Sequence, residues 1–127
     1  MHNTGFSVAI GWWRTASALR LWLLIALNLA FNIVANAGFK LSAESASRTG
    51  FLLWQVVGNL AGLITVLTLT AILRLIPLHV AYPLTVGLAV IGVQVFAAHL
   101  LFHEAISPRQ WVGTLVIAAG IALIGGR

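Results

Sequence analysis

Residues 51–73 read FLLWQVVGNLAGLITVLTLTAIL, an apolar run without a charged side chain. About 20 apolar residues in a helix are enough to cross the roughly 30 Å hydrocarbon core of a membrane. Because backbone N–H and C=O groups find no water in lipid, such a run must pair them internally as a helix. This stretch therefore predicts a transmembrane helix.

Three further apolar runs cover residues 21–39, 78–102 and 111–124. The segments between the four runs are short, so neighbouring helices must run antiparallel. We predict an all-α integral membrane protein, with four transmembrane helices and short connections in one domain, residues 19–127.

The composition agrees with this fold class and excludes several functions. Of the 127 residues, 61% are hydrophobic and 7% are charged, whereas a soluble domain carries about a quarter charged residues. A soluble enzyme is therefore excluded. The net charge of +5 is dispersed along the chain, which argues against nucleic-acid binding. With no cysteine there is no thiolate nucleophile and no cysteine-ligated metal, so any metal chemistry would fall to the four histidines and two glutamates. We expect no enzymatic activity, no cofactor and no metal site.

Residues 1–18 carry aromatic side chains among small ones and are predicted to lie on the membrane surface. The first run has an alternative interpretation as a secretory signal peptide, because Arg14 and Arg20 precede it and residues 35–37 read Ala-Asn-Ala. Its length and its asparagines favour a full transmembrane span.

The connections and helix ends carry further signals. Residues 41–50, LSAESASRTG, are predicted to form a solvated loop. Ser107 and Gln110 have the spacing of a capping box, and Pro108 suits the first helical position, so the fourth helix should begin at about Pro108. Tryptophans near span ends are predicted interface anchors: Trp22, Trp54 and Trp111.

The cations set the orientation only weakly. Arg14, Arg20, Arg74 and Arg127 fall on one side, and Lys40, Arg48 and Arg109 fall on the other. The positive-inside rule then mildly favours cytoplasmic termini. Insertion in both orientations, which would allow an antiparallel homodimer, stays equally open.

A polar row runs along the first span. Asn28, Asn32 and Asn36 recur every four residues, and Lys40 continues the row on the same helix face. An unpaired amide in hydrocarbon costs about 1–3 kcal/mol, so this face must point into the bundle, a partner chain or a water-filled cavity. Hydrogen bonding between helices is the alternative reason for the individual asparagines.

Lys40 either snorkels to the interface or faces a cavity as a binding point for an anion. An ammonium suits a phosphate, and asparagine amides suit hydroxyl groups, so the row favours a phosphorylated lipid that carries a sugar. Proton-coupled cation exporters need a carboxylate within the membrane, yet neither acid falls inside a predicted span. Glu104 follows the third span, where we expect it to pair with Arg109 or His103.

The remaining spans offer weaker signals. Gly87 and Gly92, after Tyr82-Pro83, permit a kink and close helix approach in the third span. Gln55 and Asn59 share one face of the second span, where they complete a polar cavity or form a hydrogen-bonded pair between helices. Gly113 and Gly120 stack on one face of the fourth span and predict an oligomerisation seam, with packing inside the chain as the alternative. His99 and His103 have metal-ligand spacing without the supporting glutamate of a known motif.

Residues 76–125 read IPLHVAYPLTVGLAVIGVQVFAAHLLFHEAISPRQWVGTLVIAAGIALIG. Their P-x-x-V-A-Y-P, H-E-x-x-S-P-R-x-W and G-x6-G patterns resemble the drug/metabolite transporter superfamily, in its four-helix small multidrug resistance type. The closer likeness is to flippase subunits for aminoarabinose linked to undecaprenyl phosphate.

This resemblance implies a small dimeric transporter of the bacterial inner membrane, a homodimer or a pair with a related subunit. It also marks Lys40, Tyr82, Glu104 and Arg109 as positions expected to matter. The acid of multidrug members is replaced here by Asn32, and the aromatic residue expected after the third-helix tyrosine is Thr85. Proton-coupled export of aromatic cations is therefore not expected.

Three functions remain. The leading hypothesis is a flippase or flippase subunit for a polyprenyl-phosphate-linked sugar; the others are a proton-coupled exporter of a small polar or cationic metabolite and a non-transporting subunit of a membrane enzyme. The last predicts no cavity between the chain's own helices. The predicted substrate-binding residues are Asn28, Asn32, Asn36, Lys40, Asn59, Tyr82, Glu104 and Arg109.

Overall fold

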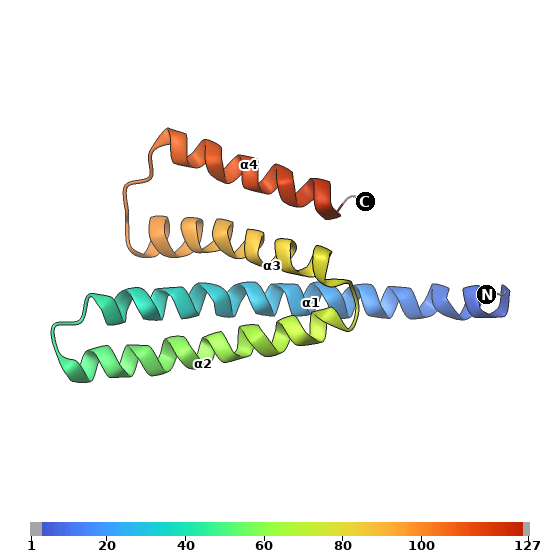
Figure 1. Ribbon diagram of the computed structural model, residues 1–127, viewed down its shortest axis with the longest axis horizontal. Helices are drawn as coiled ribbons and strands as arrows, with labels where there is room; N and C mark the ends of the chain where they lie inside the picture. The colour runs from blue at the N-terminus through green and yellow to red at the C-terminus, as the bar shows by residue number, and fades with distance from the viewer. Residues whose placement is uncertain (1–3, 126–127) are drawn as a thin grey trace.

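The computed structural model describes the backbone of residues 4–125 and the side chains of residues 18–125. The described residues form helices joined by short loops, without strands (Figure 1). In chain order these helices are α1 (Thr4–Ala43), α2 (Arg48–Leu73), α3 (Leu78–Gly92), the π-helix η1 (Val93–Leu101) and α4 (Pro108–Gly125).

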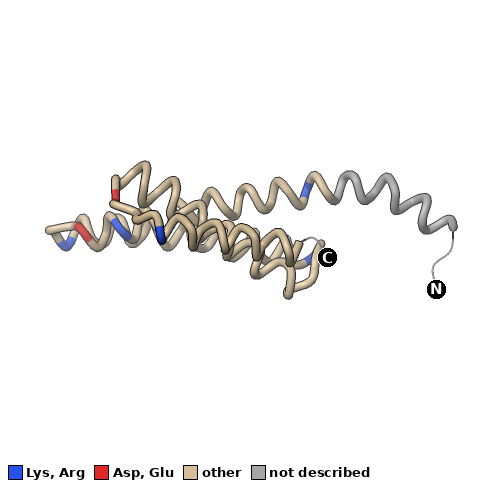
Figure 2. Tube along the Cα trace, turned by 90° about the horizontal axis from the view of Figure 1, so that it is seen from above, with Lys and Arg blue, Asp and Glu red and all other residues tan. Residues whose placement is uncertain are grey.

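Four segments are long and apolar enough to cross a membrane: Ala18–Ala43, Arg48–Leu73, Leu78–Leu101 and Pro108–Gly125. The predicted all-α, four-span membrane fold is confirmed. Charged residues lie at the two ends of the bundle formed by these spans (Figure 2). The predicted interfacial segment, residues 1–18, falls outside the described side chains except for Ala18, so its place relative to the membrane stays a prediction.

The helices lie side by side in the order α4, α3, α1, α2 (Figure 1). Contacts between α1 and α2 are the most extensive, and within the described chain α4 packs on the third span, through α3 and through His99 of η1. The chain is therefore a close pair of long helices to which the third and fourth spans are added in turn.

The connection between α1 and α2 is shorter than predicted. Within the predicted loop, residues 41–43 and 48–50 are helical, because the ends of the two helices bond to each other. The Ser42 hydroxyl is fully buried and donates to the Phe51 carbonyl at 2.8 Å, while the Ser47 hydroxyl accepts from the Gly50 N–H and caps α2. The loop proper is only residues 44–47.

Glycines permit the close approach of the helices, as the sequence predicts for the third span. A Cβ atom at Gly92 would lie 2.7 Å from Leu29 Cδ1 on α1, and one at Gly87 would lie 2.6 Å from Ile121 Cδ1 on α4. The third span therefore has one glycine against α1 and another against α4.

The second half of the third span is π-helical over nine residues, which the sequence did not predict. A π-helix pairs residues five apart and has wider turns than an α-helix. It ends at Leu101, and two residues later His103 has a left-handed φ of 54°. The Phe102 N–H donates to the Ala97 carbonyl, and beyond the reversal the Glu104 N–H donates to the Ala98 carbonyl at 2.8 Å. This reversal turns Glu104 back toward the bundle.

The predicted capping box at the start of α4 is confirmed. The Ser107 N–H donates to Gln110 Oε1 at 2.8 Å, and the Gln110 N–H donates to Ser107 Oγ at 3.2 Å. These two bonds satisfy orphan donors at the helix start, and α4 begins at Pro108 as expected.

Candidate substrate-binding cleft

An open cleft of about 650 Å³ lies between α1, α2, the third span and the start of α4. Its apolar lining comes mainly from the third span. Its polar lining consists of Asn28, Asn32, Asn36, Thr65, Thr85, Gln94, Glu104 and Gln110. The predicted asparagine row therefore faces a cleft. This agrees with the interpretation in which the row lines a cavity, the alternative being hydrogen bonds between helices. The cleft also argues against the non-transporting subunit, for which we expected no cavity.

Asn28 anchors the closed end of the row. Its side chain is only 3% exposed, and its amide donates to Thr68 Oγ1 at 3.0 Å and to the Thr65 carbonyl at 2.9 Å on α2. This residue therefore also fulfils the alternative interpretation, because it joins two helices by hydrogen bonds. Asn28 supports the cleft wall more than it offers a free group to a ligand.

Asn32 and Asn36 are less enclosed and bond along their own helix. The Asn32 amide donates to Asn28 Oδ1 at 3.1 Å, and the Asn36 amide donates to the Asn32 carbonyl at 2.9 Å. These bonds orient the two side chains and leave their amide oxygens without a donor among the described residues. The row can therefore accept hydrogen bonds from hydroxyl or amino groups in the cleft.

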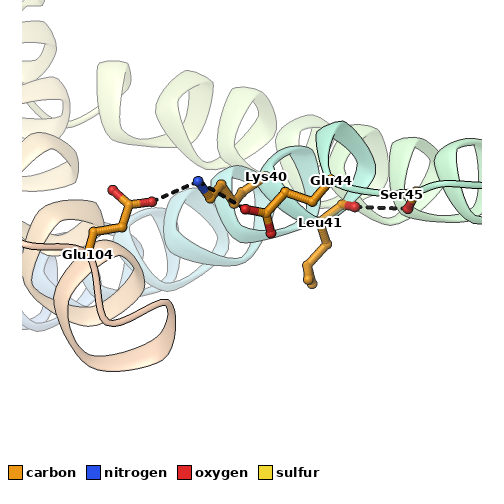
Figure 3. Close-up of polar contacts among 5 residues, drawn as sticks. All are labelled: Lys40, Leu41, Glu44, Ser45 and Glu104. Atoms are coloured by element: carbon orange, nitrogen blue, oxygen red, sulfur yellow. Dashed lines mark hydrogen bonds and ion pairs between the residues drawn. The ribbon is translucent and has the colours of Figure 1, made fainter.

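Lys40 lies between two carboxylates, those of Glu44 and Glu104 (Figure 3). Its Nζ lies 2.9 Å from Glu104 Oε2 and 3.2 Å from Glu44 Oε2, and it is 5.9 Å from the centre of the Phe102 ring. The Lys40 and Glu104 side chains are 39% and 44% exposed, so both remain accessible. This ion-paired group, which we call the mouth of the cleft, places one cation between two anions, of which Glu104 lines the cleft.

The partner of Glu104 differs from our expectation. We expected Arg109 or His103, which are near in sequence, whereas the structure pairs Glu104 with Lys40 of α1. The left-handed His103 reverses the chain and returns Glu104 toward α1. The ion pair therefore joins residues from two spans.

Several predicted site residues lie outside the cleft lining of a single chain. Lys40 reaches the cleft through Glu104 rather than lining it, and Tyr82 is exposed near the start of α3, at the far end of the third span. Asn59 is exposed on α2 and donates to Gln55 of the same helix, while Arg109 is exposed on α4. The structure brings together Asn28, Asn32, Asn36 and Glu104, with Lys40 beside them.

Several polar contributors to the cleft were not predicted from the sequence, and Thr85 and Gln110 of its lining are two of them. Gln94 lines the cleft from η1, and Thr65 and Thr68 accept the bonds of Asn28. The available signal for Gln94 was the same as for the asparagines, an amide inside an apolar span. No comparable signal marked Thr65 and Thr68, because their role depends on the approach of α1 to α2.

Among the described residues no group of three or more potential metal-ligand side chains occurs. His99 packs edge-on against Trp111 of α4, with ring centres 5.5 Å apart. His99 thus contributes to packing between the third span and α4.

Comparison with known families agrees with this geometry. The family profile described as Small Multidrug Resistance protein matches residues 20–117. The chain belongs to the small multidrug resistance family. Members of this family are small multi-pass membrane transporters that commonly form dimers. No solved structure gives a significant match to this small multidrug resistance protein.

Proposed function

We propose that the chain is a flippase, or a flippase subunit, that moves a polyprenyl-phosphate-linked sugar across the bacterial inner membrane. The observation that carries the proposal is the asparagine row lining a cleft whose mouth holds Lys40 and Glu104. A sugar head group needs hydroxyl partners inside the membrane, while its polyprenyl tail needs only lipid. An open cleft accommodates both, because the tail can remain outside.

The two charges at the mouth suit the two ends of such a head group. The Lys40 ammonium would receive the phosphate, and the Glu104 carboxylate would receive an amino group on the sugar. The pair in the unliganded chain would then separate, with each charge exchanging its partner for a ligand group. Cleft and charges thus favour an amino sugar joined to a lipid phosphate. Alternating exposure of the cleft to the two leaflets would complete the movement without covalent chemistry.

The proposal is tested by replacing Lys40 with Ala. Because the Lys40 ammonium would supply the charge-assisted contact to the phosphate, we expect binding of the phosphorylated lipid to weaken by roughly tenfold. Loss of Lys40 also leaves Glu44 and Glu104 as uncompensated anions that repel phosphate. The measurement is native mass spectrometry of the purified protein with added lipid, followed by flipping in proteoliposomes.

Arg48→Ala is the matched control, because Arg48 is an exposed cation at the same end of the bundle and outside the cleft lining. This variant should bind the lipid as the wild type does. Equal binding by Lys40→Ala and wild type would remove Lys40 as the phosphate contact. A wild-type protein that neither binds nor flips the lipid would reject the flippase.

A second candidate is a proton-coupled exporter of a small polar or cationic metabolite. It is favoured by one observation, the presence of the Glu104 carboxylate in the cleft lining. The pairing of this carboxylate with Lys40 makes the flippase our first choice. Substrate movement that drives proton flux through the wild-type protein would reverse that choice.

A further inference from the structure

Gln94 lines the cleft and forms no side-chain hydrogen bond with the described residues. It lies in η1, within the third span, and its side chain is partly buried. The amides of Asn28, Asn32, Asn36 and Gln110 each have a hydrogen-bond partner. Gln94 has none among the residues whose side chains are described.

The Gln94 amide is open to the cleft, because no buried side-chain nitrogen or oxygen among the described residues lacks a hydrogen-bond partner. Polar groups inside membrane spans usually face a cavity or pathway, where water or a ligand can bind them. Water or a ligand group in the cleft would satisfy Gln94. Its amide can both donate and accept, which matches neighbouring hydroxyl groups on a sugar ring.

The π-helix directs Gln94 into the cleft. Val86, Val90, Gln94 and Ala98 are spaced four apart, and all four line the cleft. In an α-helix a row with this spacing drifts slowly around the axis in one direction, and the wider turn of the π-helix reverses that drift. The change from α3 to η1 thus keeps Gln94 and Ala98 on the cleft side.

Close helix packing places Gln94 opposite the asparagine row. Gly92 contacts Leu29 and Ile33 of α1, so the start of η1 lies against the part of α1 that carries Asn32. Gln94 follows two residues later, and both amides belong to the same cleft lining. A head group between them would contact amides from two spans.

We infer that Gln94 is a specificity-determining residue whose amide binds hydroxyl groups of the sugar. This inference rests on the proposed function, and it assigns head-group selection to the third span as well as to the asparagine row. Lys40 would bind the phosphate shared by all polyprenyl phosphates, whereas Gln94 would distinguish lipids with a sugar from those without.

The first test compares Gln94→Leu with wild type on two probes, a sugar-linked polyprenyl phosphate and polyprenyl phosphate alone. We expect the substitution to weaken binding of the sugar-linked lipid about tenfold and to change binding of the sugar-free lipid by less than about twofold. Thr70→Leu, a polar-to-leucine change at an exposed position of α2 outside the cleft lining, should alter the affinity for neither lipid. An equal effect of Gln94→Leu on both probes, or none on either, overturns the inference.

A second test does not depend on the lipid. The chain has no cysteine, so Gln94→Cys carries a single thiol. We expect a membrane-impermeant thiol reagent to label it in vesicles, and the sugar-linked lipid to slow that labelling. Leu63→Cys, on an exposed apolar face of α2, should remain unlabelled in the bilayer. Absence of labelling at position 94 overturns the inference even when the lipid binds.

The two tests separate the failure of the inference from the failure of the proposed function. Wild-type protein that binds neither lipid refutes the proposed function, and with it the sugar contact. Labelling of Gln94→Cys then independently decides whether this position faces an accessible cleft. If the wild type binds the sugar-linked lipid and Gln94→Leu binds it equally well, only the proposed role of Gln94 is rejected.

Discussion

Lys40 forms ion pairs with two carboxylates, of which Glu104 lines the cleft and Glu44 does not. Removing either negative charge should leave Lys40 freer to bind a phosphate. Only the removal of Glu104 also takes a charged group out of the cleft. A comparison of variants at the two acids therefore distinguishes the effect of charge near Lys40 from the effect of a carboxylate in the cleft.

We predict that Glu104→Gln and Glu44→Gln both tighten binding of sugar-free polyprenyl phosphate, by roughly twofold to fivefold, because less negative charge surrounds Lys40. Only Glu104→Gln should weaken binding of an amino-sugar lipid relative to the sugar-free lipid. Lipid titration followed by native mass spectrometry measures both ratios. Abolished transport of a small cation in Glu104→Gln, with full transport in Glu44→Gln, would instead identify a proton-coupled exporter.

For individual residues, the sequence predicts which side chains belong to the candidate site better than it predicts their hydrogen-bond and ion-pair partners. The spacing of Asn28, Asn32 and Asn36 was sufficient to place them on one face, because helical periodicity is local. The bond of Asn28 to Thr68 and the pairing of Lys40 with Glu104 were not predictable. They join residues far apart in the chain and depend on how the helices approach.

The third span is the element in which local geometry and site are most closely linked. Its α-helical half packs on α4 at Gly87, and Gly92 lies where the α-helix gives way to the π-helix. The π-helical half then carries Gln94 along the cleft. Close contact at Gly92 thus determines how near this wall stands to the asparagine row.

We predict that Gly92→Ile destabilises the protein and weakens head-group binding. A Cβ atom at this position would lie 2.7 Å from Leu29 Cδ1 and 3.2 Å from Ile33 Cδ1, so a branched side chain must push η1 away from α1. Overpacking of this kind costs typically about 1–3 kcal/mol. Thermal unfolding in detergent and lipid titration measure the two effects.

Gly62→Ile is the control for this substitution, because a Cβ atom at Gly62 would meet nothing within 4 Å. It introduces the same side chain into a membrane helix without altering helix contacts inside the chain. If Gly92→Ile unfolds at the same temperature as this control, the contact of Gly92 with α1 does not support the cleft wall.

The elements themselves were largely predictable, and the reason is physical. Lipid requires long apolar helices, and a capping box satisfies backbone groups locally, so the four spans and the start of α4 were evident. The π-helix was not, because its apolar residues fit an α-helix equally well. The continuation of α1 into the predicted loop was also not predicted, since the burial of Ser42 depends on contact with α2.

At the scale of the whole molecule, α4 presents an unoccupied face. A Cβ atom at Gly113 or Gly120 would meet nothing within 4 Å, and Leu115, Val116 and Leu123 are exposed. These glycines therefore do not serve the packing of α4 on α3, which uses Ile121 against Gly87. The predicted oligomerisation seam remains our proposal for this face, consistent with the dimers common in the family.

We predict that Gly113→Leu combined with Gly120→Leu shifts the protein from dimer to monomer, because the added side chains prevent close approach of a second helix. Native mass spectrometry at several protein concentrations measures the shift, expected as about a tenfold or larger increase in the dimer dissociation constant. Gly62→Leu is the control at an equally open glycine on α2. An unchanged dimer in the double variant would place the interface elsewhere.

The isolation of α4 has a consequence for how such a protein can diversify. Most of the cleft lining comes from the first three spans, and α4 lines it with Gln110 alone, in its first turn. Mutations on the outer face of α4 are therefore free to accumulate without altering which molecule the cleft accepts. After gene duplication, such mutations can replace a homodimer with a heterodimer of two related chains, while both chains keep the same substrate specificity.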